Sequence, residues 1–425
     1  MKNRIRKILV FVSRFILAVT FMFSGIVKAI DPVGSSLKFS EYFTALNLNF
    51  LQDHTLTLSI FLSSIEFTIG AALLWGAYRK LASIFAFIFL LIFTPLTYWL
   101  ATTNAVSDCG CFGDAITLNN WETFYKNIFL LFFSTILIID NNLIKPLFNY
   151  SIRWIPTFYS FLFATFFSVY AIYHLPILDF RPYKIGVNIK EEMGLNNENN
   201  KEYIFIYEKN GNSQEFDINN LPSEEDGWNF VETIVKDNNT QEPKIKDFFV
   251  TNENGEDVTM NILDNDSIAI YLLSYDLTKA DDSNIDKIAE LNEVSKELNI
   301  PFYIITSNDP EAIKYWEEYT TDNYNYLFSD IKIIETMIRS NPGIMILNKD
   351  KIIDKLNVSD LPHPENMESY IDNISTNKIE KIKPGIIILL AMLIYFIPIL
   401  VLLLFNKTIE LVLYKKDNNS NTNIK

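Results

Sequence analysis

The two cysteines of the chain, Cys109 and Cys111, are separated by a single glycine. Two thiols at this spacing can form a disulfide, bind a soft metal ion or exchange electrons with other thiols. A Cys-x-Cys disulfide closes a very small ring, and Gly110 tolerates the backbone dihedral angles that such a ring requires. Strained, exposed disulfides are the labile and catalytic ones. The spacing therefore predicts a redox-active pair, with a static structural disulfide and a metal site as alternatives.

Asp108 and Asp114 flank the cysteine pair. Negative charges disfavour a thiolate, so we expect these carboxylates to raise the pKa of both thiols. A metal site needs three or four ligands, and the other candidates of the usual type are His54, His174, His363 and carboxylates. No ligand spacing supports such a site, and we predict none.

Six segments are apolar enough, over at least about 18 residues, to cross a membrane as helices. We predict them at residues 8–30, 56–78, 81–102, 122–140, 154–175 and 384–405. The first follows a basic start, Met-Lys-Asn-Arg-Ile-Arg-Lys, as a signal peptide would. Its apolar stretch is too long for a signal peptide and no small-x-small cleavage site closes it, so we expect a retained helix.

Lysine and arginine mark one side of the predicted bundle. They gather at the N-terminus, in the second and fourth loops and in the tail, at Lys2, Arg4, Arg6, Lys7, Arg79, Lys80, Lys145, Arg153, Lys407, Lys415 and Lys416. Because Lys and Arg are in excess in cytoplasmic loops, both termini should be cytoplasmic. The cysteine loop and residues 177–383 then lie outside. We expect a multi-pass protein of a bacterial inner membrane, surrounded by membrane lipid, with its soluble domain in the periplasm.

The charge of the chain is unevenly distributed. Its 425 residues have a formal net charge of −15. Residues 177–383 hold 41 acidic and 20 basic side chains, a net charge of −21, and the rest has a net charge of +6. Basic clusters occur only beside apolar segments, which excludes nucleic acid as a partner.

Arg14 and Glu66 lie within apolar segments. Ionisable side chains are costly in lipid and should face the bundle interior, where these two could form a buried ion pair. The pair could lock two helices together or tune the cysteine site. Arg14 is near the cytoplasmic end of its segment, so it could instead reach the membrane surface and leave Glu66 to another partner.

Residues 1–150 resemble the DoxX/MauE group of redox-associated membrane proteins. The residues that carry the resemblance are Arg14, Ser24-Gly25, Lys28 and Asp31-Pro32 in and after the first segment, Glu66 in the second, and Cys109-Gly-Cys111-Phe-Gly-Asp114 followed by Lys126-Asn127. The resemblance implies a four-helix core. MauE is linked to maturation of methylamine dehydrogenase, whose small subunit is rich in disulfides, and this implies support of disulfide formation in a partner protein.

The region between the fifth and sixth segments is polar. We predict a strand at 203–207 and a loop at 219–239. From residue 244 the pattern predicts an α/β domain with a mixed sheet. Its strands are expected at 245–250, 267–273, 302–306, 344–347 and 351–355, and its helices at 284–298, 309–319, 331–339 and 363–377.

This order resembles a thioredoxin-like domain of the thiol-disulfide oxidoreductase type, with an unrelated α/β domain as the alternative. Pro342 occupies the place of the family's cis-proline. The place of the Cys-x-x-Cys motif reads Ser274-Tyr275-Asp276-Leu277, so this domain cannot do dithiol chemistry. Pro342 and Gly343 could still form a groove that accepts an extended partner chain by backbone pairing.

We therefore predict a multi-pass α-helical membrane bundle, with a four-helix DoxX/MauE-like core plus two further transmembrane helices, and a soluble α/β thioredoxin-like domain. The expected parts are the four-helix domain (1–150), the fifth helix (151–176), a β-rich extracytoplasmic segment (177–243), the degenerate thioredoxin-like domain (244–380), the sixth helix (384–405) and a cytoplasmic tail (406–425).

Three functions stay open. In the first, Cys109 and Cys111 exchange a disulfide with an extracytoplasmic client or redox partner and are reoxidised through the bundle, with quinone as the expected acceptor and Glu66 and Arg14 tuning the site. In the second, the protein is a non-catalytic scaffold whose thioredoxin-like domain binds a client, and the cysteines form a structural disulfide. In the third, the bundle carries a small lipid-soluble molecule and the cysteine loop is a lid.

Overall fold

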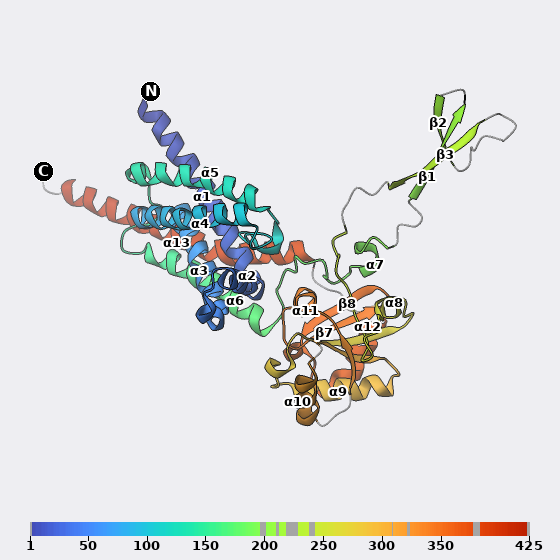
Figure 1. Cartoon of the computed structure of the whole chain (residues 1–425). Coiled ribbons are helices and arrows are strands. Elements are labelled where there is room, and N and C mark those ends of the chain that lie inside the picture. The colour runs from blue at the N-terminus through green and yellow to red at the C-terminus, as the bar shows by residue number, and fades with distance from the viewer. Residues whose placement is uncertain are drawn as a thin grey trace. The chain divides into compact units, whose positions relative to one another are not determined.

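The computed structural model describes residues 2–195, 201–209, 212–217, 228–237, 243–307, 309–320, 324–376 and 383–422. The chain divides into two compact units, one formed by Met1–Phe180 with Ile379–Lys425 and the other by Arg181–Lys378. Figure 1 shows that the first unit is helical and that the second contains the strands.

The helical unit is built from long apolar helices. They are α1 (Lys2–Ile30), α3 (Thr55–Trp75), α4 (Arg79–Thr103), α5 (Asn120–Asp140), α6 (Trp154–Tyr173) and α13 (Pro384–Thr422). Within the described residues, six segments are long and apolar enough to cross a membrane: Asn3–Ile30, Asn49–Trp75, Arg79–Thr103, Asn120–Leu143, Trp154–Tyr173 and Pro384–Leu411. The six predicted spans are confirmed, and the protein is a membrane protein.

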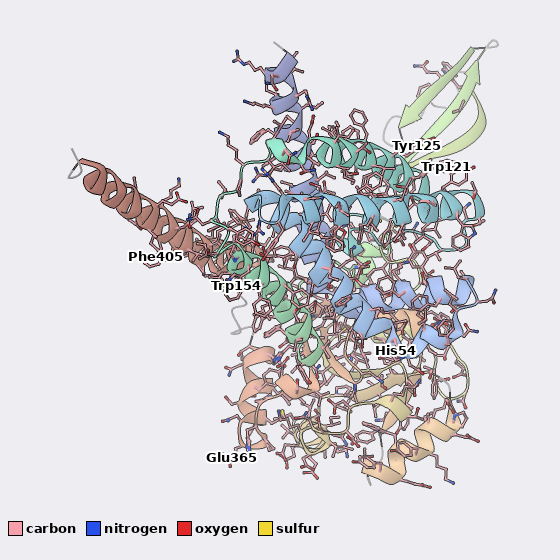
Figure 2. All side chains as sticks on the ribbon, turned by 90° about the vertical axis from the view of Figure 1, so that its left-hand side faces the viewer. His54, Trp121, Tyr125, Trp154, Glu365 and Phe405 are labelled. Atoms are coloured by element: carbon pink, nitrogen blue, oxygen red, sulfur yellow. The ribbon has the colours of Figure 1, made fainter. Side chains whose placement is uncertain are left out.

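Aromatic side chains mark both ends of the membrane helices. Trp121 and Tyr125 are exposed at the start of α5, and Trp154 is exposed at the start of α6 (Figure 2). Trp and Tyr favour the two membrane–water interfaces, because their rings are apolar and carry a polar group. These positions agree with α5 and α6 entering the membrane from opposite sides.

Two glycines allow α1 and α3 to approach each other closely. A Cβ atom added at Gly25 would lie 2.4 Å from the backbone nitrogen of Phe67, and one added at Gly70 would lie 2.6 Å from that of Met22. Small residues allow membrane helices to pack backbone against backbone. The contact at Gly25 brings the C-terminal half of α1 beside Glu66, which precedes Phe67.

A short helix, α2 (Pro32–Ala45), follows α1 and was not predicted. Asp31 is its N-cap and accepts a hydrogen bond from the backbone N–H of Gly34 at 2.8 Å, and Pro32 occupies the first helical position. The helix is too short and too polar to have been recognised from an apolar run. It nevertheless supplies two residues of the cysteine site.

The sixth span, α13, is attached to the other helices by hydrogen bonds. Pro398 has no N–H, so the carbonyl of Ile394 has no donor within the helix. The hydroxyl of Tyr159 donates to that carbonyl at 2.6 Å. The hydroxyls of Ser160 and Tyr395 lie 2.8 Å apart. In lipid a free carbonyl is costly, so these contacts favour a fixed position for α13.

The second unit contains a mixed five-stranded sheet in the order β6-β5-β4-β7-β8. Its strands are β4 (Ile268–Ser274), β5 (Phe302–Thr306), β6 (Asn325–Phe328), β7 (Gly343–Asn348) and β8 (Lys351–Asn357). Strands β4, β5 and β6 are parallel, and β7 and β8 are antiparallel to their neighbours. The accompanying helices are α7 (Ile189–Glu192), α8 (Thr259–Leu263), α9 (Ile285–Glu297), α10 (Pro310–Thr320), α11 (Ile331–Met337) and α12 (Met367–Ser375).

This unit is thioredoxin-like, as the sequence predicted. Apolar residues of neighbouring central strands are buried together in its core. Examples are Ile270 and Leu272 of β4 and Ile304 of β5. The peptide bond between Asn341 and Pro342, directly before β7, is cis. The predicted strands and helices from 267 onward are present, with ends that differ by a few residues.

Three predictions in this unit were wrong. Residues 245–250 form no strand, and only the adjacent Thr251 forms isolated bridges, with Asp257 and Phe328. Strand β6 was missed because its four residues are too few to establish a pattern. The predicted loop at 219–239 contains β3 (Asn229–Asp237), and the rest of that loop lies outside the described residues apart from Trp228.

A separate three-stranded antiparallel sheet has the order β2-β1-β3. Strand β1 (Lys201–Lys209) confirms the predicted strand at 203–207, and it pairs with β2 (Asn212–Asp217) and β3.

Candidate functional site

The cysteine pair lies in the loop between α4 and α5. Cys109 is 7 % exposed and Cys111 is half-buried. Both are free thiols, and their Sγ atoms lie 2.6 Å apart. Gly110 has a φ of +64°, and a Cβ atom there would lie 3.1 Å from Cγ of Lys38. Glycine is therefore the residue that this backbone conformation and this contact favour, and it turns the two thiols toward each other.

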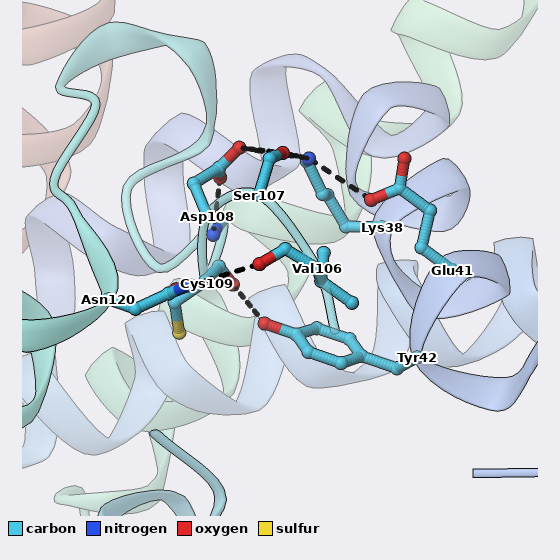
Figure 3. Close-up of polar contacts among 9 residues, drawn as sticks. Lys38, Glu41, Tyr42, Val106, Ser107, Asp108, Cys109 and Asn120 are labelled. Atoms are coloured by element: carbon cyan, nitrogen blue, oxygen red, sulfur yellow. Dashed lines mark hydrogen bonds and ion pairs between the residues drawn. The ribbon is translucent and has the colours of Figure 1, made fainter. Parts of the chain in front are cut away.

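Side chains from α2 hold the outer part of the loop (Figure 3). The hydroxyl of Tyr42 donates to the carbonyl of Cys109 at 2.7 Å. Lys38 forms ion pairs with Asp108 at 2.9 Å and with Glu41 at 3.2 Å. Asp108 in turn accepts the backbone N–H of Gly110 at 2.9 Å. The peptide unit between Cys109 and Gly110 is therefore fixed at both its carbonyl and its N–H.

Helix α1 holds the inner part of the loop. The hydroxyl of Ser24 donates to the carbonyl of Cys111 at 2.6 Å. Phe23 packs on Phe112, with ring centroids 5.4 Å apart. The ammonium of Lys126, from α5, lies 4.2 Å from the centroid of the Phe112 ring. The second cysteine is thus placed between α1 and α5.

A cavity of about 50 Å³ lies under the two thiols. Its lining includes Cys109 and Cys111, together with Lys28, Glu66 and Lys126 from three different helices. A water needs about 10–15 Å³ of such volume, whereas an engineered cavity that binds benzene measures about 150 Å³. The cavity therefore has room for a few water molecules but not for an aromatic ring.

Lys28 and Glu66 form a buried ion pair in this cavity. The ammonium of Lys28 donates to Oε2 of Glu66, and the two residues are 8 % and 4 % exposed. Of the two possibilities for Glu66, the pair with Arg14 is not formed, and the alternative of another partner is the one observed. Arg14 instead donates to the carbonyls of Leu73 and Leu74, at 2.5 and 2.6 Å.

These two carbonyls are at the C-terminal end of α3, where acceptors without a helical partner and the negative end of the helix dipole favour a cation. Arg14 therefore binds the end of a helix at a distance from the cysteines. The structure does not bring it together with the other candidate residues Glu66, Cys109 and Cys111.

The two thiols have opposite electrostatic environments. The thiol of Cys109 donates to the sulfur of Cys111, and this hydrogen bond lowers the pKa of Cys111 to about 6 against the effect of burial, with help from the ammonium groups of Lys126 and Lys28. The same hydrogen bond, together with burial, raises the pKa of Cys109. Cys111 is therefore the thiolate of the reduced pair.

The expected effect of the flanking aspartates on Cys111 was wrong. Its pKa is lowered, first by the hydrogen bond from Cys109 and then by the ammonium groups of Lys126 and Lys28. Asp108 is paired with Lys38, which offsets its negative charge. The pKa of Cys109 is raised as predicted, but by Cys111 and burial.

The histidines are not gathered around the cysteines. His54 is exposed at the end of the 3₁₀ helix η1 (Asn49–His54), which precedes α3 (Figure 2). His174 stacks on the ring of Tyr170 at 4.4 Å between centroids. His363 belongs to the other unit. In the described part of the chain, no group of three or more Cys, His, Asp or Glu residues could hold a metal ion.

The thioredoxin-like unit has a polar network where a dithiol would be expected. The hydroxyl of Ser274 donates to Oδ1 of Asn341 at 2.6 Å, and Nδ2 of Asn341 donates to the carbonyl of Asp276 at 2.7 Å. The backbone carbonyl of Asn341 accepts the N–H of Asp281 at 2.7 Å. Pro342 and the following Gly343 are buried. The carbonyl next to the predicted groove is therefore already used within the domain.

Sequence reasoning missed three site residues, Lys38, Tyr42 and Lys126, and gave Lys28 no role. Lys38 and Tyr42 come from α2, which left no apolar signal. The useful signal for Lys28 was its spacing from Ser24, because residues four apart share one face of a helix. Lys126 directly follows an aromatic stretch at the start of a span and could have been placed near the loop.

Two family models match the chain. Residues 6–140 match the family described as methylamine utilisation protein MauE. Residues 201–236, which span β1 to β3, match a domain of unknown function, DUF8463. No curated protein is a significant match.

Among solved structures, the chain is similar to a candidate protein disulfide isomerase from Bacteroides thetaiotaomicron, with 12 % identity over 31 % of this chain and 86 % of that one and a TM-score of 0.23. It is also similar to a thioredoxin-like protein from Aeropyrum pernix, with 17 % identity over 30 % and 89 % and a TM-score of 0.24. The order and direction of the five strands and the position of Pro342 describe the fold more directly than these similarities do.

Proposed function

Because residues 6–140 of this membrane protein match the MauE family model, we propose that it supports thiol–disulfide exchange or maturation of an extracytoplasmic partner protein through Cys109 and Cys111. The observation that carries the proposal is the pair itself. The two thiols are 2.6 Å apart, and one of them is a thiolate near neutral pH. A thiolate is the reactive form of cysteine in exchange reactions.

The two cysteines have different roles in this proposal. Cys111 is the more exposed one and forms the mixed disulfide with the client. The buried Cys109 is the thiol that leaves when the client is oxidised, and in the reverse reaction it attacks the mixed disulfide. When the pair is oxidised, a client thiolate attacks Sγ of Cys111, the bond between Cys109 and Cys111 breaks, and Sγ of Cys109 takes the electron pair and a proton. The second client thiolate then attacks the client sulfur of the mixed disulfide and releases Cys111 as a thiolate. Two electrons pass from the client to the pair.

An acceptor outside the chain must reoxidise the pair, because the chain has only these two cysteines. A membrane quinone, which takes two electrons and two protons to become a quinol, fits a pair located above a cavity between membrane helices. The cavity is smaller than an aromatic ring requires, so the quinone would have to bind at its rim.

We further propose that the cysteine loop faces the outside of a bacterial inner membrane and that both termini are cytoplasmic. The opposite end of the bundle is the basic one. There, Arg6 pairs with Asp140 at the end of α5, and Arg79 donates to the carbonyls of Asn142 and Ile144. An excess of Lys and Arg marks the cytoplasmic side.

The test is to trap the mixed disulfide in membranes that contain the full-length protein. With Cys109→Ser, the Cys111 thiolate can still attack a client disulfide, and the mixed disulfide should persist because no Cys109 thiolate resolves it. Such adducts should migrate slowly on gels without reductant and disappear when reductant is added. With Cys111→Ser, the matched control, no adduct should form. If both variants give no adduct and retain function with only reduced stability, the cysteines are structural and the protein is a scaffold.

A further inference from the structure

The lysines around Cys111 come from two helices on different sides of the cavity. Lys28 is on α1 and Lys126 is on α5, and both line the cavity that Cys111 also lines. Neither is part of the exchange chemistry described above. A buried ion pair is expensive to maintain, and a buried amine without a partner favours its neutral form. The position of two amines beside a thiol at this depth therefore calls for an explanation.

Helix α1 fixes Lys28 relative to Cys111 by a contact one turn away. Ser24 and Lys28 are four residues apart and share one face of the helix. The hydroxyl of Ser24 holds the carbonyl of Cys111 at 2.6 Å. Because the same turn of the helix carries both side chains, the position of Lys28 under Cys111 is set by the helix backbone.

Helix α3 supplies the partner that holds the amine of Lys28. Gly25 lies against the backbone of Phe67, and this contact places Glu66 opposite Lys28. The carboxylate of Glu66 accepts a hydrogen bond from the ammonium of Lys28. A carboxylate at this position stabilises the charged form of the lysine within an otherwise apolar bundle.

We infer that Lys28 and Lys126 form a two-cation clamp that stabilises the negative charge of the Cys111 sulfur, and that Glu66 is a positioning residue which keeps Lys28 charged and in place. The inference rests on the proposed function only for its use in exchange, because the charge state of Cys111 can be measured without a client. A stabilised thiolate also makes the disulfide form more oxidising, because the thiolate belongs to the reduced state and its stabilisation favours reduction.

Charged and titratable groups reach Cys111 from three helices and from its own loop. The charged and titratable groups that face it are Lys28 from α1, Glu66 from α3, Lys126 from α5, and Cys109 from its own loop. Lys38 and Tyr42 of α2 also line the cavity, and Lys38 is paired with Asp108 and Glu41. Helix α4 contributes the apolar residues Phe89, Leu90 and Phe93 to the lining.

Glu66 offers a test in which two roles predict opposite results. If Glu66 acts only as a negative charge, it disfavours the thiolate of Cys111, and Glu66→Gln would lower the pKa of Cys111. As the residue that keeps Lys28 charged, its loss would make Cys111 a weaker acid. The direction of the change therefore distinguishes a nearby charge from a positioning residue.

The experiment measures the rate of iodoacetamide alkylation of Cys111 between pH 4 and 9, in the reduced full-length protein in membranes, with Cys109→Ser as the common background. The background change replaces the Cys109 thiol by a hydroxyl in every variant, so its effect on Cys111 is the same throughout the series. Lys28→Met and Lys126→Met should each slow alkylation at pH 6 by about tenfold, which corresponds to about one pKa unit. Lys28→Arg should restore the rate, because it retains the charge. Lys7→Met, an exposed lysine of the same helix, is the control and should have no effect.

Glu66→Gln should also slow alkylation, but in the double variant it should not slow alkylation beyond the effect of Lys28→Met, because Glu66 positions only Lys28. The double variant leaves no buried charge, so it carries the measurement if Lys28→Met alone does not fold. Faster alkylation of Glu66→Gln at pH 6, or an unchanged profile for Lys28→Met and the double variant, would overturn the clamp. Neither result bears on the trapping of a mixed disulfide, so the proposed function and the clamp fail separately.

Discussion

The membrane unit and the thioredoxin-like unit divide features that many thiol oxidoreductases combine in one domain. The membrane unit has the cysteine pair, in a loop between two helices of a bundle. The other unit has the mixed sheet and the cis bond before Pro342, but the sequence between β4 and α9 contains no cysteine. The chemistry of a cysteine site depends on its side chains and charges, and it can therefore be separated from the thioredoxin-like fold.

The cysteine site and the segment after β4 of the thioredoxin-like unit also have opposite electrostatic environments. Ammonium groups of Lys126 and Lys28 favour a thiolate at Cys111. In the thioredoxin-like unit, burial first and then the carboxylates of Glu335 and Asp276 raise the pKa of Tyr275, directly after β4. An anion is therefore stabilised in the membrane unit and disfavoured at the corresponding place in the other unit.

The largest expected effect is on the pH dependence of the cysteine pair. The lowered pKa of Cys111, about 6, means that its thiolate dominates above pH 6 and is lost as the pH falls below it. Alkylation of Cys111 in the otherwise unaltered reduced protein should fall about fivefold from pH 6 to 5 and about tenfold from pH 5 to 4, or about fiftyfold in all. Cys109 should react only at a higher pH, because its pKa is raised. Equal profiles for the two cysteines, read by mass spectrometry of the labelled peptides, would contradict this asymmetry.

The next effect concerns the helix contact that positions the ion pair. Gly25→Ala places a Cβ atom against the backbone of Phe67, where α3 must move to accept it. We expect a loss of about 1–3 kcal/mol, measured by thermal unfolding in detergent. Gly385→Ala, in a second span, is the matched control, because no atom lies within 4 Å of its added Cβ. Similar melting temperatures for the two variants would mean that the approach of α1 to α3 is not tight.

A smaller effect is expected in the thioredoxin-like unit. Asn341→Ala removes the hydrogen bonds to Ser274 and to the carbonyl of Asp276, at a cost of about 1–2 kcal/mol. Asn373→Ala, at an exposed position of α12, should cost much less. The alkylation profile of Cys111 should be the same in both variants, because the two units have separate cores. A shifted profile in Asn341→Ala would show that the soluble unit influences the cysteine chemistry.

The smallest effect is expected at the sixth span. Tyr159→Phe removes the donor to the carbonyl of Ile394 that Pro398 leaves without a helical partner. We expect a loss of about 1 kcal/mol, seen as faster proteolysis within α13. Tyr125→Phe, at an exposed position of α5, serves as the control. Identical digestion of both variants would indicate that α13 is held by apolar packing alone.

Apolar runs and helical spacing were sufficient to predict most of the fold. The six spans and the α/β order from residue 267 onward follow from hydrophobic periodicity, which acts locally. The elements that were missed, such as α2 and β6, are short, and their formation depends on capping by Asp31 or on pairing with β5. The site was predicted in part. Cys109, Cys111 and Glu66 line one cavity, but Arg14 binds the end of α3 instead.

The sequence alone determined that two thiols, one residue apart, follow a membrane span, and that a thioredoxin-like order of elements lacks cysteines. Both are properties of residue type and spacing. Only the tertiary structure decided which carboxylate partner Lys28 has and which of the two thiols is the anion. Both outcomes depend on the approach of α1 to α3 at Gly25 and on the distances between charges from three helices. The sequence does not give these distances, because electrostatic interactions depend on distance in space rather than along the chain.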